Sequence, residues 1–143
     1  MIAKTVVFRT VVALAGMALV LSFGAGPAFA AVCLDTSMTS DEIVETINAA
    51  RSCERAMKVF QDCEFGASGD VDLGAAVERK CEADFRTRLT ASQTSAYQRE
   101  MRVCDAKHRN ESGTMYLSFT AFCRAEVAQR YSRRALKATG TSR

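Results

Sequence analysis

The spacing of apolar residues predicts two amphipathic helices in the last third of the chain. They are separated by Asn110–Gly113, a run of turn-favouring residues. The first starts at a capping box, Thr90-Ala-Ser-Gln93, and its inner face carries Tyr97, Met101 and Cys104. The second should run from about Thr114 to Ala138. Its apolar first half is expected to meet all the other helices, whereas its arginine-rich second half is expected to be largely exposed.

Two further helices are predicted upstream of this pair. A capping box, Thr39-Ser-Asp-Glu42, starts one that should continue to about Cys63, where Gly66 can take the left-handed conformation that ends helices. Its apolar face comprises Ile43, Ile47, Ala50, Met57 and Phe60. The next helix begins near Asp70 or Asp72, and its stripe comprises Leu73, Val77, Cys81, Phe85 and Leu89. No alternating strand pattern is found, so the predicted fold is all-α with about four helices.

The first thirty residues have the pattern of a cleaved signal peptide. Lys4 and Arg9 precede an apolar run, and Ala28-Phe-Ala30 provides a small-x-small cleavage site. The run is shorter than the roughly 20 residues that a spanning helix needs, which favours cleavage over retention as a membrane anchor. We therefore expect residues 1–30 to be removed and residues 31–143 to form one helical domain, periplasmic or extracellular, with no stable membrane insertion.

All six cysteines lie in the expected mature part. An even number of cysteines after an export signal favours three disulfides over free thiols. Six cysteines allow many pairings, and their number does not choose among them. The two predicted turns, near Ser68 and Glu111, favour staples across each hairpin. This places the bonds at Cys53–Cys81 and Cys104–Cys123 and leaves Cys33–Cys63 to hold the segment before the first helix.

Charge is distributed unevenly along the mature chain. Residues 31–98 carry 7 basic and 12 acidic side chains, and residues 99–143 carry 10 and 4. The asymmetry could steer a charged partner. The commoner outcome is two solvated faces that attract one another within the fold. On the first reading, the candidate partner-binding residues are Asp70, Asp72, Glu78, Arg130, Arg133 and Arg134.

The residues of this chain do not indicate catalysis. His108 is the only histidine, and Cys104, one helical turn before it, is expected to be in a disulfide and so cannot act as a nucleophile. We expect no pocket of converging polar groups around His108. No Cys-x-x-Cys pair, serine elbow or glycine-rich phosphate loop is found. We predict a protein that is not an enzyme, with no catalytic residues, no metal site, no cofactor and no nucleic-acid partner.

From Cys53 to Leu136 the chain resembles the LprI-type lysozyme-inhibitor family of exported bacterial proteins. The matching motifs are Cys53-Glu-Arg-Ala56, Cys63, Leu73 to Phe85-Arg86 with Leu89, Gln98-Arg99, Cys104, Cys123, and Arg130 to Leu136. Three departures stand beside them: Met101 replaces the family's usual tryptophan, Cys104 arrives a few residues early, and Cys33 and Cys81 are additional. The resemblance implies a helical, disulfide-stapled envelope protein, and some members of the family inhibit lysozyme.

Two functional hypotheses follow. In the first, the protein is an exported binding protein that inhibits lysozyme or binds another envelope protein by surface contact. Its acid-rich segment Asp35–Asp84 would face the basic rim of the lysozyme, and the arginines of the last helix would reach the cleft. In the second, it is a structural or stress-related periplasmic protein with no enzyme target.

Overall fold

The computed structural model describes residue 33 and residues 38–140, and these form an all-α domain. Within them lie five α-helices and one short 3₁₀ helix, with no strand. The helices are α1 (Ser40–Ala49), α2 (Cys53–Asp62), α3 (Asp70–Glu82), α4 (Ala91–Lys107) and α5 (Thr114–Ala138), and the 3₁₀ helix η1 (Arg86–Arg88) joins α3 to α4. The all-α prediction is confirmed. The signal-peptide and cleavage predictions concern residues outside the described part.

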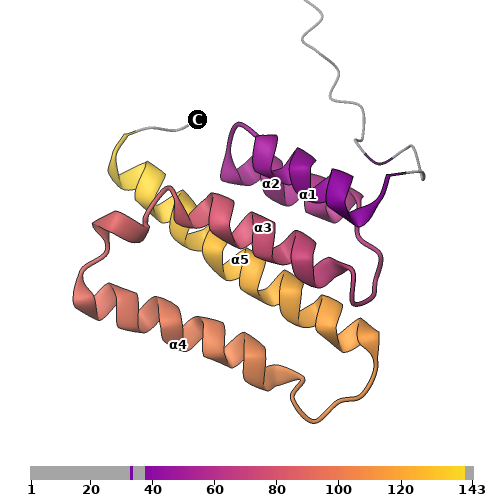
Figure 1. Cartoon of the computed structure of the whole chain (residues 1–143). Helices are drawn as coiled ribbons and strands as arrows, with labels where there is room; N and C mark the ends of the chain where they lie inside the picture. The colour runs from indigo at the N-terminus through magenta and orange to yellow at the C-terminus, as the bar shows by residue number, and fades with distance from the viewer. Residues whose placement is uncertain (1–32, 34–37, 141–143) are drawn as a thin grey trace, which may run out of the picture.

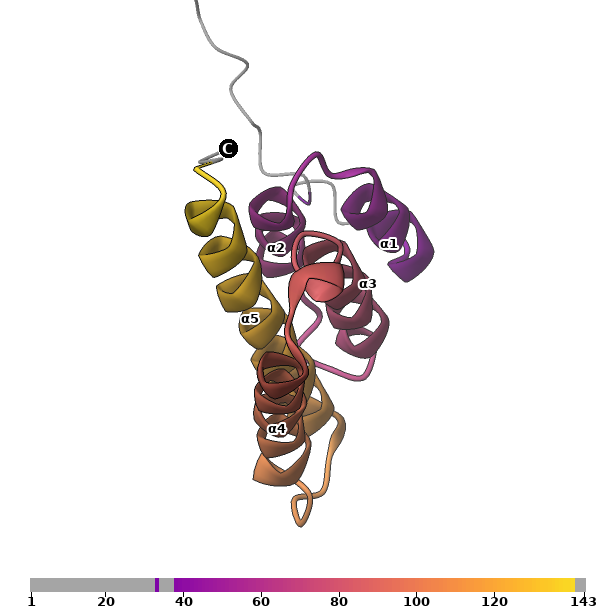
Figure 2. The same cartoon turned by 90° about the vertical axis from the view of Figure 1, so that its left-hand side faces the viewer.

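The central elements are α3 and α5, which lie against each other along most of α3 (Figure 1). The paired helices α1 and α2 cover one side of this centre, and α4 covers the other, mainly against α5 (Figures 1 and 2). Two hydrogen bonds show the relative direction of α3 and α5. Asp70 accepts from Ser118 and Asp84 accepts from Ser132, and each serine lies 48 residues after its aspartate. The helices α3 and α5 therefore run in the same direction.

The first predicted helix is in fact two helices. Ala50 has an extended backbone, with ψ of 139°, and Ser52 caps α2 by accepting a hydrogen bond from the Arg55 backbone N–H at 3.2 Å. Ser52 can cap a new helix, so the predicted helix breaks after Ala49. The predicted apolar face is buried on both sides of the break. The capping box at Thr39 is confirmed. Gly66 has a φ of 67°, but α2 ends earlier, at Asp62.

The second predicted helix also ends earlier than its apolar stripe. Helix α3 stops at Glu82, so Phe85 and Leu89 lie in the connection to α4. Phe85 is nevertheless buried, because it packs into a second core cluster with Tyr97, Met101 and Tyr131. Helices α4 and α5 begin and end close to the predicted positions, and the capping box at Thr90 is confirmed.

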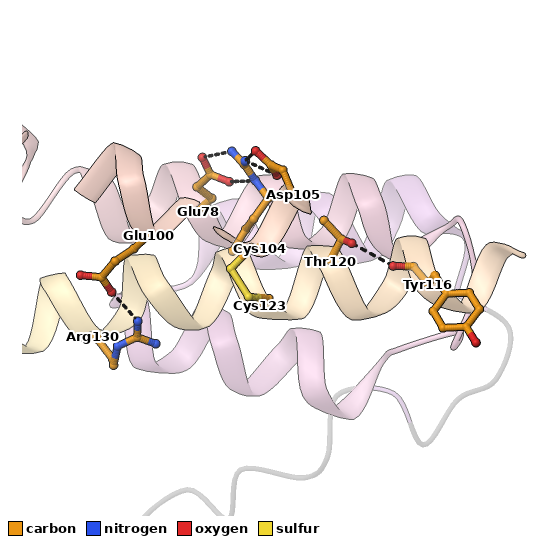
Figure 3. The surroundings of a disulfide bond; sticks show 9 residues. Glu78, Glu100, Cys104, Asp105, Tyr116, Thr120, Cys123 and Arg130 are labelled. Atoms are coloured by element: carbon orange, nitrogen blue, oxygen red, sulfur yellow. Dashed lines mark hydrogen bonds and ion pairs between the residues drawn. A yellow bond between two sulfur atoms is a disulfide. The ribbon is translucent and has the colours of Figure 1, made fainter. Parts of the chain in front are cut away.

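Three disulfides hold these elements together. The bonds are Cys33–Cys63, Cys53–Cys81 and Cys104–Cys123, which is the pairing favoured by the two hairpin turns. The second joins the start of α2 to the end of α3, and the third joins α4 to α5 (Figure 3). All six cysteines are bonded. Disulfides of this number are typical of proteins in oxidising, non-cytoplasmic compartments.

Candidate interaction surface

Asp70, predicted to bind a partner, is instead an internal structural residue. Its side chain is fully buried and accepts hydrogen bonds from the backbone N–H groups of Phe65 and Gly66, at 2.8 and 2.9 Å. The hydroxyl of Ser118 donates to it at 2.6 Å. These bonds hold the α2–α3 loop against α5. Because the carboxylate has no exposed surface, the prediction that Asp70 contacts a partner is wrong.

Glu78 and Asp72, the other two predicted acids, lie in different settings. Glu78 accepts two hydrogen bonds from the guanidinium of Arg124, at 2.9 and 3.0 Å, and the same guanidinium donates to Asp105 on α4 (Figure 3). Glu78 is therefore already bound across the α3–α5 contact. Asp72 is exposed in the first turn of α3. Of the three predicted acids, only Asp72 is open to a partner.

Two of the three predicted arginines are paired within the molecule. Arg130 donates to Glu100 at 2.7 Å (Figure 3), and Arg133 donates twice to Glu54. The hydrogen bond from Arg133 lowers the pKa of Glu54 below its ordinary value, against the opposing effect of burial. Arg134 is exposed, and its guanidinium carbon lies 5.4 Å from the centroid of the Tyr131 ring. The six predicted residues thus form no single site.

Two ion pairs inside the fold join the acidic part of the chain to the basic part. Glu54 and Glu78 belong to the acidic part of the chain, and their partners Arg133 and Arg124 belong to the basic part. The pairs draw α2 and α3 towards α5. Because the paired side chains remain partly exposed, each contributes little stability, on the order of 0 to 1 kcal/mol. Of the two interpretations of the asymmetry, the contacts support attraction between two faces of one molecule.

A groove, which sequence reasoning missed, runs along the first half of α5. Its floor is the apolar stripe Met115, Phe119 and Phe122, which lie at helical spacing on one side of α5, and Glu126 lies at its edge one turn further on. Met115 and Phe119 are 47% and 45% exposed, although the sequence predicted that this half would meet every other helix. The helix packs on α3, α4 and α2 instead, while α1 packs on α2 and α3. Met115 and Phe119 are therefore left about half exposed. We call this hollow the α5 groove.

The walls of the α5 groove come from two separate segments. Glu64 and Gly66 of the α2–α3 loop form one wall, and Lys107 and His108 at the end of α4 form the other. The hollow measures about 690 Å³. It is open, and it lies beside the first half of α5, between the α2–α3 loop and the end of α4. The sequence predicted no pocket of converging polar groups around His108. A hollow is present there, but its floor is apolar.

Aromatic contacts hold the groove in shape. The Phe122 ring stacks on Phe60 of the core, with centroids 4.0 Å apart and planes inclined by 11°. The His108 ring lies 5.5 Å from Tyr116 and 5.7 Å from Phe119, centroid to centroid. The Cys104–Cys123 disulfide clamps α4 to α5 directly beneath this wall. Because neighbouring rings already hold Phe119 and Phe122, these two side chains lose little freedom when a partner binds.

The groove does not carry the parts of a nucleophilic or metal site. Cys104 and Cys123 are bonded to each other, so no thiolate stands beside His108. Within residue 33 and residues 38–140, no group of three or more His, Cys, Asp or Glu side chains could hold a metal ion. Over the same residues, no helix has both the length and the apolar character needed to cross a membrane. The groove therefore offers an apolar contact surface with charged side chains at its edges.

Comparison with family models, with curated proteins and with solved structures gives no match to this chain. The similarity to lysozyme inhibitors therefore rests on the motifs in the sequence alone, and inhibition stays a prediction.

Proposed function

We propose that this protein is an exported binding protein whose α5 groove docks a protein partner, and that a basic lysozyme is that partner. The observation that carries the proposal is the half-exposed apolar stripe of Met115 and Phe119 on a helix fixed by a disulfide. Apolar side chains gathered in a groove between polar edges are typical of protein–protein contact sites. The three disulfides are compatible with export.

Charge at the edges of the groove favours a basic partner. Glu64 and Glu126 are exposed carboxylates that line it, against one ammonium, Lys107. Lysozymes are often strongly basic. A basic, partly apolar segment of such an enzyme would place its apolar part on Met115 and Phe119 and its cations near the two carboxylates. This mode of binding differs from the one predicted from the sequence, because Asp70, Glu78, Arg130 and Arg133 already have partners within the fold.

The test is inhibition of cell-wall lysis by the mature, oxidised protein, titrated against animal-type and goose-type lysozymes. The double variant Met115→Asp/Phe119→Asp places charge on the groove floor and should weaken inhibition by about tenfold or more, because loss of a central hot-spot contact costs about 2 kcal/mol or more. Val103→Asp is the matched control: Val103 is 65% exposed on α4, outside the groove, so inhibition should be unchanged.

Two results would reject the proposal in different ways. Undiminished lysis at a large excess of the wild-type protein, with both classes of enzyme, would reject lysozyme as the partner and favour the structural or stress-related alternative. Inhibition that survives the double variant unchanged would keep lysozyme and reject the groove as the contact site.

A further inference from the structure

A second pocket lies at the opposite end of α5 from the groove. It is lined by Phe85 and Leu89 of the α3–α4 connection, by Gln93 and Ala96 at the start of α4, and by the last turns of α5. Its volume is about 580 Å³, within the range of about 300 to 1,000 Å³ that is typical of small-molecule sites. In Figure 1 this is the end of the molecule where α4 begins and α5 finishes.

The floor of the pocket is apolar and consists of packed aromatic rings. Phe85 and Tyr131 lie with ring centroids 5.5 Å apart, and both contact Tyr97, at 5.2 and 5.0 Å. Each tyrosine hydroxyl has a fixed acceptor: Tyr131 donates to Glu100 at 2.9 Å and Tyr97 donates to Glu82 at 3.0 Å. With their polar ends satisfied elsewhere, the rings present hydrocarbon to the pocket, which Leu89 and the alanines of α4 and α5 extend.

The charge at this pocket is of one sign. Arg88 and Arg134 line it, both exposed, and no acidic side chain does. Within residue 33 and residues 38–140, neither arginine forms an ion pair with a carboxylate, whereas Arg124, Arg130 and Arg133 all do. Gln93 uses its side-chain oxygen to accept from the Thr90 backbone N–H at 2.9 Å, so its amide hydrogens can donate. Two guanidinium groups and one amide donor thus lie around the apolar floor of the pocket.

We propose that this pocket binds a single-chain fatty carboxylate, with the alkyl chain on the Phe85–Tyr131 floor and the carboxylate held by Arg88 and Arg134. Guanidinium groups match carboxylates in geometry as well as charge, and such charge-assisted hydrogen bonds are the strong ones. A pocket of this size takes one alkyl chain more readily than the paired chains of a membrane lipid. This site is independent of the α5 groove, so either can be correct without the other.

The experiment compares three ligands of equal chain length, each below its micelle-forming concentration: dodecanoate, dodecanol and dodecyltrimethylammonium. Binding is followed by calorimetry and by amide shifts in nuclear magnetic resonance spectra of the mature, oxidised protein. Dodecanoate should bind with one-to-one stoichiometry and shift amides at Leu89, Ala96 and Ala135. The neutral and cationic ligands should bind at least about tenfold more weakly, as expected when charge-assisted hydrogen bonds are absent.

The variants test the assigned role of the arginines. Arg88→Gln/Arg134→Gln should weaken dodecanoate binding about tenfold or more and leave dodecanol binding unchanged. Arg109→Gln, an exposed arginine outside the pocket, is the matched control and should change neither. The single variants serve if the double variant does not fold. Equal affinity for all three ligands, shifts centred elsewhere, no binding of dodecanoate, or an unaffected double variant would each overturn the assignment.

Discussion

The two sides of α5 use opposite kinds of residue. The side against α3 is built from small or hydroxylated residues, Ser118, Ala121, Ala125 and Ser132, and all of them are buried. There the helices approach so closely that a Cβ added at Gly74 would lie 2.8 Å from the Cβ of Ala121. The groove side carries large residues, Met115, Phe119 and Phe122. Close helix packing selects small side chains, whereas on the groove side Phe122 stacks on Phe60 and the part of Met115 and Phe119 that faces the groove is left open.

The two sides also differ in how polar groups are satisfied. On the α3 side, Asp70 and Asp84 are bound by Ser118 and Ser132, and no buried side-chain nitrogen or oxygen of the described residues lacks a hydrogen bond. Around the groove, Glu64, Lys107 and Glu126 are exposed. The α3 side determines the fold, and the groove side remains open to a partner. Variants on the two sides should therefore separate stability from binding.

The largest effect on stability is expected at Asp70. Replacing it by alanine removes the acceptor for Ser118 and for two backbone N–H groups, so Asp70→Ala should lower the free energy of unfolding by about 3 kcal/mol or more. Asp72→Ala, two residues away and exposed, is the control and should change it by less than about 0.5 kcal/mol. Chemical denaturation of both variants measures the difference. Similar values for the two would show that burial of Asp70 has no energetic role.

The next effect concerns the clamp between α4 and α5. Cys104→Ala/Cys123→Ala opens a disulfide whose ends lie 19 residues apart, and the lost restriction of the unfolded chain should cost about 3 kcal/mol. Denaturation experiments measure this loss of stability. We also expect weaker partner binding, because Cys123 lines the groove. Wild-type stability and wild-type binding in this variant would mean that packing alone holds the two helices.

The smallest effect is expected at the Glu54–Arg133 pair. Hydrogen bonding to Arg133 lowers the pKa of Glu54 in the folded state, so its contribution is present above the ordinary value of 4.5 and is lost as pH falls through the folded-state pKa. Because both side chains are about half exposed, Glu54→Gln should cost no more than about 0.5 kcal/mol near pH 7. The difference from wild type should shrink as the pH falls below 4.5 and Glu54 becomes protonated. A difference that grows on acidification would contradict this assignment.

Much of the fold could be predicted from local signals. The capping boxes at Thr39 and Thr90 mark true helix starts, and the turn at Asn110–Gly113 divides α4 from α5. The break before α2 was missed, although Ser52 is a strong N-cap residue, because the apolar face continues through it. Local patterns therefore predict which residues are buried, but they do not show whether a continuous apolar face belongs to one helix or to two.

The candidate sites were predicted less well, for reasons of geometry. From the sequence alone, a carboxylate such as Asp70 is expected at the surface. Its hydrogen-bond partner Ser118 lies 48 residues further along the chain, so no local pattern reveals that Asp70 is buried. One signal of the groove was present: from Met115 to Phe122, apolar residues occur on more than one side of the helix. Such a helix needs more neighbours than a small domain supplies. The pocket at Arg88 and Arg134 depends on how η1 and α5 meet, which no local pattern encodes.

The most direct test of the central claim, that the α5 groove is the contact surface, is an interface map. Amide hydrogen exchange of the mature protein would be measured with and without a basic lysozyme at saturating concentration. We predict increased protection concentrated at residues 115–122, at the α2–α3 loop around Glu64, and at His108, with little change on α1. Protection confined to α1 and α2, or none along α5 while lysis is inhibited, would contradict the claim.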